Sequence, residues 1–541
     1  MNPGPLPPKP GLPPSEIRNE SESAVARFAG PISLATFLSR ILGFARDVFI
    51  ARFFGAALIA DAFFVAFAIP SMFRRLLTEG ALTSAFIPVY SDVRAGRGEE
   101  AARRFSGAMA VSLAVFLALF CLLGIGLARP LVAALAPGFV SDPAKFGLTI
   151  RLTQVVFPFL FFIGLSAVAA GVLNASRRFF IPALAPAVQN VAMIAALWLA
   201  GAAVRAEEAV LWLAWGVVIG GALQLLMLLP PMSRMGIFPA PAIPWKVPGV
   251  GRCLSLMGPA AFGVAILQIN ILIDRWLASF LAEGSISYLY YANRLVQFPH
   301  GILSIAVAAA AFPVLADRAA KKRHGEATEE AGGRTLAEAW RLTLFITLPA
   351  TFGLIALARP IMEVLFERGA FGAADTAASA AALRAYAAGL VFFGLSRLLA
   401  AAYHSRLDTR FPVRCANWAV LANVVGSVAL MFPLKFVGLA LATSMASALN
   451  AYLLYRGLKV SGEWPGEPIA AALKYPLPIS ALMGAGLYWI NWLLWPAGAG
   501  IWLRAGVLFF EIAAGAGLYL AVCARFMPEP SMLKRTLLGR N

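Results

Sequence analysis

Three charged side chains stand inside an apolar run near the start of this sequence, and they are the residues best suited to chemistry. The stretch LSRILGFARD contains Arg40, Arg46 and Asp47. On a helical wheel these charges fall with Ser39 and Gly43 inside an arc of roughly 120°, and apolar residues occupy the remainder. An ionisable residue in a transmembrane helix costs at least about 2.5–3.5 kcal/mol, so it normally faces a partner or a water-filled cavity. The pattern therefore predicts a helix with one cationic face.

More charges follow in the next apolar run and in later ones. The second run holds Asp61 and then PSMFRRLLTEGALTSAF, in which Arg75 and Glu79 are four residues apart and can pair along one helical face. Arg74 points about 100° away from Arg75 and needs another partner. The later runs also carry charges, among them Asp274, Arg275, Arg294 and Arg397.

Arginines outnumber acids in these runs, and the imbalance indicates an external anion. For a single arginine of this kind, a structural role, as a salt-bridge strut or as a side chain that reaches the interface, is as well supported as a binding role. The whole set is different, because several members have no acid nearby in the sequence. Guanidinium binds phosphate oxygens bidentately and stays charged at any relevant pH. The residues alone predict a transporter with a cationic central cavity, to which a pyrophosphate-bearing lipid is suited.

Composition places these charges in a membrane. Of 541 residues, 60% are hydrophobic and 13% are charged, whereas soluble proteins have about 25% charged residues; the mean hydropathy is +0.77. Because a helical span needs roughly 20 apolar residues, we expect an all-α polytopic membrane protein with about fourteen transmembrane helices. The expected spans are 28–50, 57–88, 106–134, 148–174, 183–203, 208–230, 250–281, 286–315, 336–358, 376–402, 412–432, 437–458, 469–490 and 500–525.

The loops between the spans alternate between rich and poor in lysine and arginine, which predicts topology and domains. The positive-inside rule puts the rich set and both termini in the cytoplasm, so the net charge of +18 does not indicate nucleic acid. We expect a disordered cytoplasmic tail over 1–23, which lacks the pattern of a signal peptide. Two bundles of six spans follow, 24–231 and 250–458. Two further spans, 469–525, precede a cytoplasmic tail, 526–541.

Other kinds of chemistry have little support in the sequence. The scattered cysteines and histidines predict no disulfide framework, metal site or cofactor; they are Cys121, Cys253, Cys415, Cys523, His300, His324 and His404. An enzyme acting on polyprenyl pyrophosphate needs a nucleophile, a base or clustered metal-binding acids, and no DxD or EExxE pattern occurs. A non-transporting assembly partner is disfavoured by the cost of so many intramembrane charges.

Several stretches together resemble the MurJ (MviN) family of lipid II flippases. They are LSRILGFARD, ADAFFVAFAIPSMFRRLLTEGALTSAFIPVY, APGF, NASRRFFIPALAPAVQN, MGPAAFGVAILQIN, YYANRLVQFPHG and YHSRLDTRFPVR. The resemblance covers about residues 24 to 525. It implies a member of the multidrug/oligosaccharidyl-lipid/polysaccharide (MOP) exporter superfamily, with two six-helix lobes in a V around a central cavity and two C-terminal helices that form a lipid-tail groove.

The resemblance also implies a substrate, partners and site residues. The substrate is lipid II, undecaprenyl-pyrophosphoryl-MurNAc-pentapeptide-GlcNAc, moved across the bacterial inner membrane for peptidoglycan synthesis, with cell-wall synthesis proteins as further partners. The implied substrate-binding residues are Ser39, Arg40, Arg46, Asp61, Arg74, Arg75, Glu79 and Arg294. An implied cation site consists of Asp274, Asn423 and Thr443, but Ser427 stands where a second acid would help.

The resemblance leaves an alternative within the same superfamily. Some family members have carboxylates where this chain has Asn293 and Gln297, so Arg294 has fewer counter-charges here. An O-antigen or polysaccharide lipid flippase, or a multidrug exporter, would share the fold. Drug exporters favour cationic substrates, however, and are expected to have acidic cavities. The cationic set therefore favours the lipid II flippase.

Overall fold

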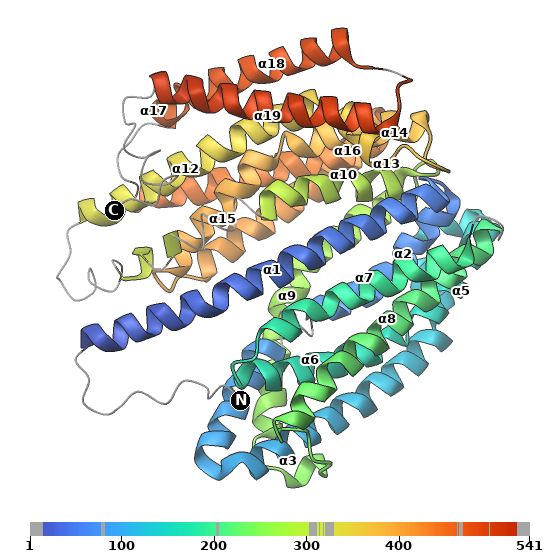
Figure 1. Cartoon of the computed structure of the whole chain (residues 1–541), viewed down its shortest axis with the longest axis vertical. Helices are drawn as coiled ribbons and strands as arrows, with labels where there is room; N and C mark the ends of the chain where they lie inside the picture. Colours follow the sequence, from blue (N-terminus) through green and yellow to red (C-terminus); the bar gives the residue numbers. More distant parts are fainter. Residues whose placement is uncertain are drawn as a thin grey trace. The chain divides into compact units, whose positions relative to one another are not determined.

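The computed structural model describes residues 14–76, 82–201, 205–301, 311–312, 314–317, 319, 329–462, 464, 469–496 and 498–526. Every regular element in those ranges is helical, which confirms the all-α prediction. Figure 1 shows the helices with their labels. The first group is α1 (Pro14–Phe54), α2 (Leu58–Arg75), α3 (Leu82–Gly126), α4 (Ala128–Leu135), η2 (Pro137–Ser141), α5 (Pro143–Val156), α6 (Phe159–Ala175), α7 (Phe180–Ala200), α8 (Ala206–Arg234) and η3 (Pro244–Lys246). The second group is α9 (Val250–Ala278), α10 (Ser285–Pro299), α12 (Glu329–Ala356), α13 (Ala358–Phe366), α14 (Ala373–Ala387), α15 (Leu390–His404), α16 (Arg410–Val460), α17 (Ile469–Leu473), α18 (Pro476–Leu494) and α19 (Ile501–Phe526).

Helix α1 begins inside the segment 1–23 that was expected to be a tail. Pro14 is its first residue. Proline is common at this position because the backbone N–H that it lacks would have no partner within the first turn of the helix. The residues that follow Pro14 include glutamate, arginine and alanine, which favour helix although they are polar or small. The expected boundary at residue 23 therefore does not coincide with the helix start.

Nine helical segments in the described part of the chain are long and apolar enough to cross a membrane. One of them, α16, has 51 residues, about 76 Å at 1.5 Å per residue, whereas the hydrocarbon core is only about 30 Å thick. Lys435 has a non-helical conformation with φ 52° inside α16, so this element is two helices, as the expected spans 412–432 and 437–458 require. Most of the intramembrane charges lie on α1, α2, α9 and α10, which are not among the nine. The total of fourteen spans stays a prediction.

The chain forms two compact units. Unit 1 consists of Met1–Phe53, Ala62–Ala134 and Asp142–Ile269, and unit 2 of Phe54–Asp61, Leu135–Ser141 and Asn270–Asn541. The division therefore falls inside α9, not at the expected boundary between residues 231 and 250. The reason is packing, because Val250 and Cys253 at the start of α9 belong to the buried core of unit 1.

Unit 1 is built around aromatic residues of α3 and close contacts of α8. Phe86, Tyr90 and Phe105 stack in its core, with ring centroids 5.6 Å apart in both the Phe86–Tyr90 and the Phe86–Phe105 pairs. Helix α8 packs on α6 and α7. A Cβ at Gly220 would lie 2.9 Å from the Gln189 Cα, so glycine is required for α8 to approach α7 this closely.

Unit 2 joins its two C-terminal helices to α13 through a buried ion pair. Arg504 at the start of α19 lies 2.6 Å from the Glu363 carboxylate, and their side chains are only 18% and 11% exposed. The Trp495 indole N–H donates to both carboxylate oxygens at 3.2 Å. Helices α18 and α19 run side by side (Figure 1), and this contact fixes the end of that pair on α13.

Replacing Arg504 with leucine is expected to destabilise the protein by about 3–5 kcal/mol, because Glu363 would keep its buried charge without its cation. The measurement is the thermal unfolding midpoint of the purified protein in detergent. Arg525→Leu, an exposed arginine on the same helix, is the matched control and should leave the midpoint unchanged. Equal midpoints for Arg504→Leu and the wild type would show that the pair contributes nothing.

Candidate functional site

The charged face predicted for α1 is held to α7 within unit 1. Arg46 lies 2.6 Å from the carboxylate of Asp47, and its Nη1 donates to the Asn190 side-chain oxygen at 3.0 Å. Asn190 in turn donates to the Ser39 carbonyl at 3.2 Å. Asp47 is fully buried and the Arg46 side chain is 11% exposed. The guanidinium of Arg46 is therefore fixed in position and partly neutralised by protein groups.

Arg40, on the same helix, stands in contrast to Arg46. Its side chain is half-buried, and it makes no hydrogen bond or ion pair with any residue in the described ranges. An intramembrane guanidinium without a protein acid beside it is the group most open to an external anion.

Two of the predicted arginines lie at the end of α2, and the structure gives each of them a defined place in unit 1. Arg75 Nη1 donates to the Gln268 side-chain oxygen of α9 at 3.2 Å. The expected partner, Glu79, lies outside the described residues, so that pairing stays a prediction. Arg74 lines a cavity of about 360 Å³ in unit 1.

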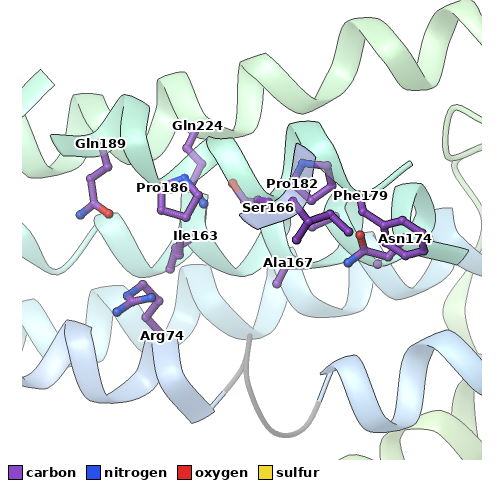
Figure 2. Close-up of a pocket in the computed structure, with 14 residues that line it drawn as sticks. Arg74, Ile163, Ser166, Ala167, Asn174, Phe179, Pro182, Pro186, Gln189 and Gln224 are labelled. Carbon is purple, nitrogen blue, oxygen red and sulfur yellow. The ribbon is translucent and has the colours of Figure 1, made fainter. Parts of the chain in front are cut away.

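This cavity, which we call the unit 1 pocket, lies among α1, α2, α6, α7 and α8 (Figure 2). Its lining residues are Ile32, Arg74, Ile163, Ser166, Ala167, Ala170, Gly171, Asn174, Phe179, Pro182, Ala183, Pro186, Gln189 and Gln224. Arg74 is the one charged side chain among these fourteen. In Figure 2 it faces the pocket from α2, and Gln189 and Gln224 enter from the opposite wall.

Sequence reasoning missed the amide side chains of the unit 1 pocket. Gln189 and Gln224 are only 7% and 6% exposed although they stand in the apolar spans α7 and α8. A glutamine inside an apolar span indicates a functional position in the sequence alone, because polar groups in the membrane are energetically costly. Neither glutamine was predicted, because the charged residues alone indicated the cationic cavity.

Asp61, one of the predicted substrate-binding residues, has a defined structural position in unit 2. Its carboxylate is buried and accepts hydrogen bonds from the Gly284 and Ser287 N–H groups, both at 2.9 Å, and from the Ser287 hydroxyl at 2.7 Å. The physical reason is that the first N–H groups of α10 have no partner within the helix and an anion there also matches the helix dipole. The Tyr291 hydroxyl donates to the Gly55 carbonyl at 3.2 Å. Asp61 thus anchors the turn between α1 and α2 to the start of α10.

Arg294 also belongs to unit 2, on α10, where its side chain is half-buried. One turn further along, Gln297 donates through its side-chain amide to the Asn293 side-chain oxygen. The Asn293 and Gln297 amides therefore bond to each other along α10.

The predicted cation-site residues come together in unit 2. Asn423 donates its amide N–H to one Asp274 oxygen at 2.8 Å, and the Thr443 hydroxyl donates to the other at 3.4 Å. A cation would need the Asn423 amide turned so that its oxygen faces inward, and one carboxylate is a weak donor set for a dehydrated ion. In the described residues, His, Cys, Asp and Glu form no group of three that could hold a metal ion. The donors fit a monovalent cation only after that amide rotation.

Comparison with known proteins assigns a family to this arrangement. The family model "Lipid II flippase MurJ" matches residues 50–504. The chain is 36% identical over 504 residues to a Vibrio cholerae protein named "Probable lipid II flippase MurJ", covering 91% of this chain and 94% of that one. It is 35% identical over 460 residues to "Lipid II flippase MurJ" of Burkholderia cenocepacia, covering 84% and 88%.

Solved structures agree with this assignment. The chain matches "Lipid II flippase MurJ, inward closed conformation" with a TM-score of 0.75 and 27% identity, covering 94% of this chain and 99% of that one. It matches an inward-facing multidrug resistance MATE family transporter of the MOP superfamily with a TM-score of 0.63 and 13% identity, covering 79% and 95%, which shows a shared fold. The chain belongs to the MurJ family of lipid II flippases.

Proposed function

We propose that this chain is a flippase that moves lipid II from the cytoplasmic to the periplasmic leaflet of the bacterial inner membrane. The observation that carries the proposal is its identity of 35–37% to lipid II flippases over most of its length. The nine membrane-crossing segments in the described residues support a multi-pass inner-membrane protein. Both termini lie in the cytoplasm under the positive-inside rule. A flippase translocates its substrate and makes or breaks no bond in it.

Guanidinium groups recognise the pyrophosphate of lipid II in this proposal. The binding set is the predicted one: Ser39, Arg40, Arg46, Asp61, Arg74, Arg75, Glu79 and Arg294. Arg40 is supported by its lack of a protein acid in the described ranges, because a phosphate oxygen would supply the missing counter-charge. Arg46 is supported by its fixed position, since Asp47 and Asn190 hold the guanidinium before substrate arrives. Asp47 beside Arg46 partly neutralises that arginine and so limits the trapping of substrate.

Transport follows alternating access. The head group enters from the cytoplasm, the protein reorients, and the head group leaves on the periplasmic side while the polyprenyl tail stays in the bilayer. Helices α18 and α19 are proposed to hold that tail. The Asp274, Asn423 and Thr443 set is proposed to bind a coupling cation, with Asp274 as the one anionic donor.

The test is replacement of a cell's own flippase. In bacteria depleted of their flippase, expression of this chain is expected to restore lipid II at the outer leaflet, measured by its accessibility to an externally added lipid II-degrading enzyme. The control is the same cells with an empty vector. If lipid II stayed inside although the chain was inserted at normal abundance, the proposed function would be wrong.

A further inference from the structure

One side chain of the unit 1 pocket is buried without a hydrogen-bond partner. The Gln224 side-chain oxygen is inaccessible to solvent and has no partner among the residues that the structure describes, and the whole residue is 6% exposed. More than about 90% of buried polar groups in proteins are hydrogen-bonded, and an orphan costs about 1–3 kcal/mol. Because Gln224 also lines the unit 1 pocket, a rotation of its terminal amide would bring this oxygen to a ligand that donates to it.

Tight helix packing holds this amide and its neighbour in place. A Cβ at Gly220 of α8 would lie 2.9 Å from the Gln189 Cα, and one at Gly221 would lie 2.7 Å from the Phe159 ring of α6. The two glycines therefore let α8 wedge between α6 and α7. Gln224 follows one turn after Gly220 on α8, and Gln189 stands at the α7 contact itself. The two amides are preorganised on rigid helices rather than on a loop.

The chemistry of the unit 1 pocket matches an uncharged amide next to an anion. A primary amide has two donors and an acceptor, so one glutamine can accept from the N–H of a secondary amide while the other glutamine donates to its C=O. Arg74 supplies a positive charge, and no acid is found among the fourteen lining residues. Ile163, Pro182 and Pro186 form an apolar wall that suits a methyl group or a sugar ring face.

We propose that the unit 1 pocket is a specificity subsite in which Gln189 and Gln224 bind a secondary amide of the lipid II head group. This inference rests on the proposed function and extends it from the pyrophosphate to the uncharged part of the substrate. Two parts of the head group carry this chemistry: the N-acetyl groups of the sugars and the amides of the peptide stem. Both are absent from the bare lipid carrier pyrophosphate.

The test compares three glutamine-to-methionine variants of the full-length purified protein, two in the pocket and one control. Gln224→Met keeps the side-chain length but removes its hydrogen bonds, and Gln154→Met, an exposed glutamine of α5 outside the pocket, is the control. Gln224→Met is expected to weaken lipid II binding about 3- to 10-fold, the value of one hydrogen bond, and Gln189→Met to do the same. Binding of undecaprenyl pyrophosphate should be unchanged in both. The Gln224→Met thermal midpoint should equal or exceed that of the wild type, because the orphaned oxygen is gone.

A shortened substrate distinguishes the two sources of the amide. If Gln224→Met also weakens binding of lipid II trimmed to a single-residue stem, the N-acetyl groups are the ligand. If its effect disappears with that substrate, the ligand is the peptide stem. Equal affinity of Gln224→Met and wild type for complete lipid II, or an equal loss toward undecaprenyl pyrophosphate, would overturn the subsite and leave the proposed function standing. A wild-type protein that binds no lipid II would overturn both.

Discussion

Alanine at Arg40 is expected to lower lipid II export about 10- to 100-fold without lowering the amount of chain in the membrane. A hydrogen bond to a charged group contributes about 1.5–3 kcal/mol, and each 1.4 kcal/mol is a factor of ten in affinity. Arg40 makes no ion pair with a described residue, so its removal leaves no protein acid without a cation. The loss should therefore appear in transport and not in folding. The measurement is outer-leaflet lipid II in depleted cells, normalised to chain abundance.

The matched control is Arg52→Ala, which removes an exposed arginine from the last turn of the same helix. It should retain wild-type export, because Arg52 lies outside the proposed binding set. Two results would count against the role given to Arg40. One is wild-type export by Arg40→Ala, and the other is an equal loss in both variants.

Alanine at Arg46 is expected to have its largest effect on stability. Asp47 is fully buried and lies 2.6 Å from the Arg46 guanidinium. Removing the guanidinium therefore leaves the Asp47 carboxylate buried in a low-dielectric environment without this cation. Breaking a buried pair in this way costs about 3–5 kcal/mol. Arg46→Ala should therefore unfold at a lower temperature and reach a lower abundance in the membrane. Adding Asp47→Asn removes the buried charge and should recover most of the lost stability.

An exposed ion pair, Arg94–Glu99, serves as the control for the loss of stability expected in Arg46→Ala. Arg94 and Glu99 lie 2.7 Å apart, but their side chains are 39% and 42% exposed. Surface pairs contribute only about 0–1 kcal/mol, so Arg94→Ala should change the thermal midpoint little. If Arg46→Ala and Arg94→Ala had the same midpoint, the Arg46–Asp47 pair would not have the structural role assigned to it.

Much of the fold was readable from the sequence because the membrane imposes simple rules. Apolar length predicted helices throughout, and charge periodicity singled out α1 as a helix with a polar face. The predicted grouping of Asp274, Asn423 and Thr443 is also found as direct hydrogen bonds in the structure. That grouping came from family resemblance and not from spacing, since the three residues stand far apart in the chain.

The partners of the charged residues were not predictable from the sequence. A helical wheel gives the direction of a side chain but not the distant residue that lies opposite. The sequence therefore did not reveal that Asp61 accepts hydrogen bonds at the start of α10, from a residue 223 positions later. Arg75 contacts Gln268, 193 residues away, by the same kind of long-range packing. The unit boundary inside α9 depends on core contacts of Val250 and Cys253 that no local pattern reveals.

The most direct test asks whether Arg46 binds substrate or only holds α1 in place. Arg46→Ala combined with Asp47→Asn should be inserted at nearly wild-type abundance. Its export of lipid II, measured at the outer leaflet of flippase-depleted cells, decides between the two roles. We expect export to stay at least about 10-fold below wild type, because the guanidinium that binds the pyrophosphate is missing. Export at the wild-type level from this double variant would show that Arg46 only holds α1 in place and would contradict the central claim.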